Sequence, residues 1–170
     1  MSVIDTLYGV GKGRPARRQA NLFSGDVSQC VGECVERTAM NMLAHAVDYD
    51  HWILAYSGGK DSSATVTVIV TLIQLGAIPA PKTLTVMYAD TRMELPPLQA
   101  AARVMMDRLR AMGISVMEVV APMDDRFYVY MFGRGVPPPS NTFRWCTPQI
   151  KVEPMTAAIA DTVGRLGGRC

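Results

Sequence analysis

The chain has 170 residues, of which 49% are hydrophobic and 19% charged, and its formal net charge is +2 at pH 7. This length accommodates one domain with its own core and argues against two full domains. The composition excludes an intrinsically disordered chain and a coiled coil, and so small a net charge does not by itself indicate a polyanionic partner.

Basic residues crowd into the N-terminal stretch beside glycines and a proline, namely Lys12, Arg14, Arg17 and Arg18. We expect residues 1–25 to form a flexible basic arm that is solvated, and the alternative is an arm that contacts nucleic acid. The first twenty residues lack the apolar core of a signal peptide. No apolar run approaches the roughly 20 residues that span a bilayer. We therefore expect a cytoplasmic protein with no membrane contact, in which the four cysteines are thiols, metal ligands or catalytic groups rather than disulfides.

The remainder, residues 26–170, shows an alternation of helical and strand patterns. Apolar positions recur at helical spacing from residue 26 to 48, with Asp26 as a plausible N-cap. Three short apolar segments predict buried parallel strands over residues 52–56, 83–89 and 114–120. A second amphipathic helix is predicted to begin near Pro96 and to stop at Gly113.

The segment after the first strand is ambiguous because residues 65–71 are mostly β-branched, which favours a strand by propensity. We predict a helix over residues 61–75, since this segment is long for a strand and Gly76 suits the position after a helix end. Residues 123–141 are predicted to be a long ordered loop rather than helix or sheet, and a closing helix is expected from near Pro154 towards Val163. The alternation predicts an α/β fold, with a parallel sheet whose ligand crevice lies at the carboxyl ends of the strands.

A glycine turn stands between the first strand and the helix that follows it. Such a turn places unpaired backbone N–H groups at the positive end of a helix dipole, which is a geometry that binds phosphate. Lys60 adds a cation, Ser57 and Ser62 add hydroxyl donors, and Asp61 is a candidate ligand for Mg²⁺. The predicted phosphate-binding residues of this turn are Ser57, Gly58, Gly59, Lys60, Asp61 and Ser62.

Two common phosphate loops are excluded by the same residues. A Walker A loop needs glycine where this chain has Leu54 and Ser or Thr where it has Asp61, and no third glycine completes a dinucleotide fingerprint. The remaining pattern, Ser-Gly-Gly-x-Asp-Ser, resembles the pyrophosphate-binding loop of the N-type ATP pyrophosphatases. That resemblance implies that the loop grips the β- and γ-phosphates of ATP while a nucleophile attacks the α-phosphate and pyrophosphate leaves.

The second predicted strand ends at Asp90-Thr91. This strand end resembles the sulfate-activating branch of the same superfamily, which implies that Asp90 and Thr91 border the nucleotide and that acidic residues here hold ribose or metal. For Glu94, two interpretations stay open: such a role, or a favourable charge at the start of the next helix.

A third motif comprises the run Gly133-Arg134-Gly135-Val136-Pro137-Pro138-Pro139-Ser140 and the segment from Phe143 through Trp145-Cys146-Thr147 to Lys151. Together with the glycine turn and the end of the second strand, this motif resembles the phosphoadenylyl-sulfate-reductase-like family over roughly residues 40–154. The resemblance is best to the DndC-type branch, the sulfurtransferases of DNA phosphorothioation. The resemblance implies a three-layer adenine nucleotide alpha-hydrolase-like (HUP-type) fold with helices on both faces of the sheet. It also implies that Arg144 and Lys151 neutralise phosphate charge and that Cys146, with Lys60 and Asp61, takes part in catalysis. The other interpretation of Cys146 is a buried core thiol.

The chain departs from the family in its cysteines and at its end. DndC-type relatives carry an iron–sulfur cluster, but Cys30, Cys34, Cys146 and Cys170 lack the usual cluster spacing. Only three of the five family strands are found, residues 167–170 look like the approach to a fourth, and the nucleotide-lining Gly-x-Arg-x-x-Glu-Ser motif is absent. We therefore expect a domain incomplete at its C-terminus, with a sheet edge that a partner chain or a second copy completes.

Three functional hypotheses follow from the resemblance. The first is an ATP- and Mg²⁺-dependent, adenylate-forming sulfurtransferase that acts on a nucleic acid or nucleotide with a sulfur-donor protein. The second is a phosphoadenylyl-sulfate reductase, although the cysteine-bearing tail of that branch is missing. The third is a truncated nucleotide-binding protein without turnover.

Overall fold

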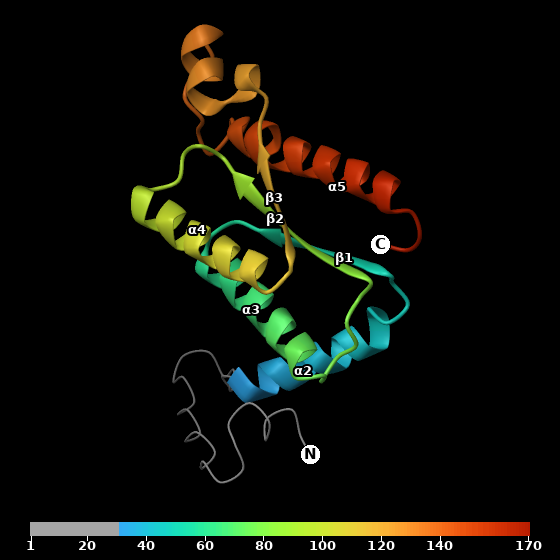
Figure 1. Cartoon of the computed structure of the whole chain (residues 1–170). Coiled ribbons are helices and arrows are strands. Elements are labelled where there is room, and N and C mark those ends of the chain that lie inside the picture. Colours follow the sequence, from blue (N-terminus) through green and yellow to red (C-terminus); the bar gives the residue numbers. More distant parts are fainter. Residues whose placement is uncertain (1–30) are drawn as a thin grey trace. The chain divides into compact units, whose positions relative to one another are not determined.

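A three-stranded parallel sheet with the order β1-β2-β3 is the central element of the computed structural model, which describes residues 31–170 (Figure 1). The strands are β1 (His51–Tyr56), β2 (Thr83–Asp90) and β3 (Ser115–Val120). All three predicted strands are confirmed, with ends that shift by one residue. The predicted arm over residues 1–25, the N-cap Asp26 and Cys30 lie outside the described residues.

Four α-helices accompany the strands in the described part of the chain: α2 (Val31–His45), α3 (Lys60–Gln74), α4 (Pro96–Ala111) and α5 (Glu153–Leu166). The helix prediction for the β-branched segment is confirmed by α3. Its threonines fit a helix because the hydroxyls of Thr65 and Thr67 donate to carbonyls one turn earlier, at 3.0 and 2.7 Å.

Glycine ends α3 and α4 in the same way. Gly76 and Gly113 have left-handed φ angles of +66° and +78°, which glycine adopts without steric cost. The N–H of each glycine bonds a carbonyl of the preceding turn (3.0 Å to Ile73 and 2.9 Å to Arg110), and the next residue bonds the carbonyl before that. This is the Schellman arrangement, so both predicted stops are local properties of the sequence.

The loop prediction for residues 123–141 is wrong, because the segment contains a 3₁₀-helix, η1 (Met123–Asp125), and a π-helix, η2 (Val129–Gly133). Contacts between aromatic rings distant in the sequence account for these helical turns. The rings of Phe127 and Tyr130 lie 5.3 and 4.8 Å from the ring of Trp145, centroid to centroid. The closing helix is also longer than predicted, since a second π-helix, η3 (Pro148–Val152), runs directly into α5.

Trp145 holds this region by stacking and by one hydrogen bond, because its indole Nε1–H donates to the carbonyl of Pro137 at 3.1 Å. We expect Trp145→Phe to lower the free energy of unfolding by at least about 1 kcal/mol, since phenylalanine leaves a carbonyl without its donor and is smaller than the indole. Thermal denaturation should show a Tm lower by about 2–4 °C. An unchanged Tm would show that the hydrogen bond contributes nothing to stability.

The described residues form two compact units. One contains residues 31–48 and Val68–Ala80, and the other contains Tyr49–Thr67 and Pro81–Cys170. In the first unit the buried apolar side chains are Val35, Ala39, Ile69, Val70, Leu72 and Ile78. The second unit holds the whole sheet, α4, α5 and every residue of the site described below.

Both faces of β2 are covered. Its residues from Thr85 to Asp90 are all buried, and successive side chains of a strand point to opposite faces. Helices α4 and α5 both contact β3, and Figure 1 shows them on opposite sides of the sheet. The predicted α/β class with a parallel sheet is therefore confirmed. Within residues 31–170, none of the helices has both the length and the apolar character needed to cross a membrane.

Residues 167–170, expected to approach a further strand, form no strand in the structure. They nevertheless lie against the start of β1. The carbonyl of Arg169 accepts hydrogen bonds from the backbone N–H groups of Asp50 and His51 at 2.9 and 3.1 Å.

Candidate functional site

The turn between β1 and α3 depends on glycine at position 58. Gly58 has a φ of +76°, which side-chain-bearing residues rarely adopt. A Cβ atom placed there would lie 3.3 Å from the Cβ of Ala102 and 3.4 Å from Cε2 of Tyr88. Glycine thus allows both the reversal of the chain and its close approach to α4 and β2.

Serine hydroxyls hold the shape of this turn. The hydroxyls of Ser57 and Ser62 lie 3.1 Å apart, and the N–H of Ser57 donates to the hydroxyl oxygen of Ser62 at 3.3 Å. Ser63 donates to the carbonyl of Gly59 at 2.8 Å. The predicted phosphate contact Ser62 is therefore engaged within the turn, where it braces Ser57.

A small pocket opens beside the turn. Its volume is about 110 Å³, and its residues come from the β1–α3 turn, from β2 and the segment after it, from α4 and from η3. The lining residues are Ser57, Gly58, Gly59, Tyr88, Glu94, Leu98 and Lys151. Four of the predicted site residues line this pocket: the consecutive residues Ser57, Gly58 and Gly59, and Lys151, which is distant from them in the sequence.

The charged residues of this pocket are Lys151 from η3 and Glu94 from the segment between β2 and α4. Both side chains are half-buried. Glu94 is positioned by Thr91, whose hydroxyl donates to Glu94 Oε1 at 3.0 Å. Thr91, predicted to border a nucleotide, therefore orients a lining residue and is not one itself.

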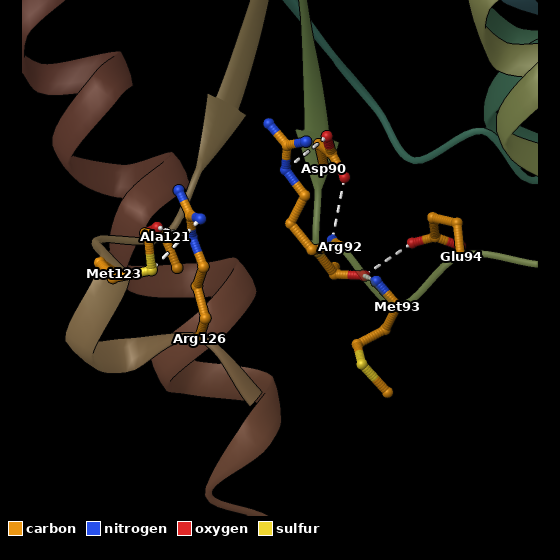
Figure 2. A network of polar contacts seen from close by, with 8 residues as sticks. Asp90, Arg92, Met93, Glu94, Ala121, Met123 and Arg126 are labelled. Carbon is orange, nitrogen blue, oxygen red and sulfur yellow. Dashed lines mark hydrogen bonds and ion pairs between the residues drawn. The ribbon is translucent and has the colours of Figure 1, made fainter. Parts of the chain in front are cut away.

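The end of β2 is a tightly bonded turn (Figure 2). The carboxylate of Asp90 accepts the backbone N–H of Arg92 at 2.9 Å and pairs with Nε of the same arginine at 3.1 Å. Arg92 has a φ of +61°, a strained value for a residue with a side chain. The buried Asp90 carboxylate thus stabilises this conformation and does not line the pocket.

The other predicted residues lie apart from the pocket lining. Lys60, Asp61 and Arg144 are exposed, and Cys146 is half-buried with a free thiol. In the part of the chain that the structure describes, no three His, Cys, Asp or Glu side chains gather where they could hold a metal ion. Cys34 and Cys170 are both exposed.

Sequence reasoning missed two lining residues, Tyr88 and Leu98. Tyr88 is 2% exposed, and its hydroxyl is buried without a hydrogen-bond partner among the described residues. Burial raises the pKa of this phenol above its usual value of 10.0, and the negative charge of Asp90 raises it further. A signal existed, because Tyr88 carries a hydroxyl in a predicted buried strand and lies two residues before Asp90, on the same face.

Comparisons of the chain with protein-family models, with curated proteins and with solved structures each found no match.

Proposed function

We propose that the chain binds ATP with its pyrophosphate portion in this pocket and releases pyrophosphate while it transfers AMP to an acceptor oxygen. The observation that carries the proposal is the convergence of the Ser57–Gly59 turn and Lys151 on one pocket. Both elements were predicted, from separate motifs, to contact the phosphates of one nucleotide. The resemblance to the ATP pyrophosphatases supplies the reaction, and with it we assign the sheet to the HUP-type fold.

The chemistry and size of the pocket suit a pyrophosphate group. The turn precedes α3, so backbone N–H groups and the positive end of the helix dipole are available to an anion, and Lys151 adds a full charge. A water molecule needs a cavity volume of about 10–15 Å³. A pocket of about 110 Å³ accepts one or two phosphate groups and leaves the nucleoside outside.

Magnesium would accompany ATP, since Mg²⁺ is usually bound through one or two carboxylates together with substrate phosphates. Glu94 is a carboxylate that lines the pocket, whereas Asp61 is exposed in the first turn of α3. We therefore assign the metal contact to Glu94 ahead of Asp61. Bound there, the ion would neutralise charge on the departing pyrophosphate.

The proposed reaction has two steps. An oxygen of a nucleic-acid or nucleotide acceptor attacks the α-phosphorus of ATP, and the bond to the β-phosphate oxygen breaks. A sulfur nucleophile then displaces AMP from the acceptor and takes the place of the oxygen. Cys146, half-buried beside η3, is the proposed sulfur carrier: a donor protein would transfer sulfane sulfur to its thiolate, and the terminal sulfur of the resulting persulfide would displace AMP from the acceptor. An external thiol would then reduce the disulfide between acceptor and Cys146, which releases the sulfur-bearing acceptor and restores the Cys146 thiol.

The reaction is tested by product analysis with ATP labelled at the α-phosphate, Mg²⁺, double-stranded DNA, a low-molecular-weight persulfide as the sulfur donor and a thiol reductant. We expect labelled AMP and free pyrophosphate from the wild-type chain. Labelled ADP with free phosphate would contradict the proposal. Saturable ATP binding without any product would replace it with a nucleotide-binding protein that does not turn over.

A further inference from the structure

The hydroxyl of Tyr88 is the unexplained polar group of this pocket. The side chain is 2% exposed and lines the pocket, yet its hydroxyl oxygen has no hydrogen-bond partner within residues 31–170. Buried polar atoms are nearly always paired, because burial of an unpaired hydroxyl costs free energy that a phenylalanine would not cost. An exception at a pocket wall calls for a functional explanation.

A second buried tyrosine, on the neighbouring strand β1, has a hydroxyl that is hydrogen-bonded. Tyr56 is the register partner of Tyr88 on β1, is equally buried, and has its ring centroid 5.6 Å from that of Tyr88. The hydroxyls of Tyr56 and Ser63 are hydrogen-bonded to each other at 3.3 Å. Of these two tyrosines, the one that lines the pocket is therefore the one whose hydroxyl is unpaired.

The position of the Tyr88 hydroxyl relates it to the glycine turn. It lies 3.9 Å from the position that a Cβ of Gly58 would occupy, which puts it directly beside the proposed phosphate-binding backbone. The Tyr88 hydroxyl is covered in this structure. An oxygen of a ligand would reach the hydroxyl after a small shift of the turn. Glycines at positions 58 and 59 have no side chains that would obstruct this contact.

We propose that Tyr88 is a binding residue of this site, whose hydroxyl donates a hydrogen bond to an oxygen of the bound pyrophosphate group. The inference rests on the proposed function and extends it by a residue that no motif indicated. An anion in the pocket is an acceptor only, so the phenol must keep its proton. Burial and the nearby charge of Asp90 raise its pKa, which keeps the hydroxyl a donor throughout the physiological range.

The test compares wild type, Tyr88→Phe and Tyr56→Phe, with Mg²⁺-pyrophosphate as the probe in calorimetric titration and with thermal denaturation of each full chain without the probe. For Tyr88→Phe we expect a Kd for pyrophosphate raised about ten-fold, the usual effect of one hydrogen bond to a charged acceptor. Its Tm should equal or exceed that of wild type, because an unpaired buried hydroxyl is removed. Tyr56→Phe should lower the Tm and leave the Kd for pyrophosphate unchanged.

Each other outcome has a definite meaning. If wild type binds pyrophosphate and Tyr88→Phe binds it equally well, the role of Tyr88 is overturned and the proposed function stands. If Tyr88→Phe lowers both Tm and affinity, the tyrosine is structural and its role as a donor is overturned. If wild type does not bind pyrophosphate, the proposed function fails and the inference fails with it.

Discussion

Gly58→Ala should weaken binding of ATP and of pyrophosphate by at least about ten-fold, the largest effect we expect from a single methyl group in this chain. Alanine at a φ of +76° costs about 1–2 kcal/mol in backbone strain. Its Cβ would also lie 3.3 Å from Ala102 and 3.4 Å from Tyr88, closer than most real contacts. The backbone must therefore move away from α4 and β2, and the N–H groups of the turn move with it. Calorimetric titration with Mg²⁺-pyrophosphate measures the effect.

Gly113→Ala is the matched control. Gly113 has nearly the same φ, +78°, and it ends α4 away from the pocket lining. A Cβ added to Gly113 would have no neighbouring atom within 4 Å among the residues that the structure describes. The substitution should lower the Tm through the same backbone strain and leave the Kd for pyrophosphate unchanged. Equal losses of affinity in the two variants would mean that Gly58 acts through global stability and not through the shape of the site.

Lys151→Met should raise the Kd for ATP and pyrophosphate by about ten- to a hundred-fold, since a charged hydrogen bond contributes about 1.5–3 kcal/mol. Methionine keeps the apolar stem and removes the charge of a half-buried side chain that lines the pocket. The loss of affinity should be largest at low ionic strength, because at high ionic strength salt already screens the charge of Lys151 in the wild-type chain. Titrations at two salt concentrations separate this electrostatic effect from a change in packing.

Two other lysines serve as comparisons for Lys151. Lys60 follows the glycine turn but is exposed and does not line the pocket, so Lys60→Met should have the smaller effect of the two. Lys82 pairs with Asp50 at 2.9 Å, before the start of β2, and Lys82→Met should leave the affinity unchanged. A larger effect at Lys60 than at Lys151 would place the pyrophosphate on the outer side of the turn and contradict the assigned pocket.

Local features of the sequence were enough to predict the secondary structure between Val31 and Val120. The apolar runs marked three strands, and Gly76 and Gly113 marked two helix ends, because a left-handed residue and its backbone hydrogen bonds involve only neighbours in the chain. After Val120 local reasoning predicted the closing helix α5 but missed the helical turns before it. The helical turns η1 and η2 accompany the packing of aromatic rings on Trp145, which is distant in the sequence.

The candidate site divides in the same way. Residue types alone indicate that a turn at Ser57, Gly58 and Gly59 joins a strand to a helix, since glycine adopts the positive φ that a tight turn requires. The side chains that share the pocket with this turn became known from the tertiary structure. It selected Lys151 over Lys60 and placed beside Gly58 the hydroxyl of Tyr88, which has no hydrogen-bond partner among residues 31–170. Spacing along a chain specifies backbone conformation, whereas the meeting of side chains from separate strands and helices depends on how the whole sheet packs.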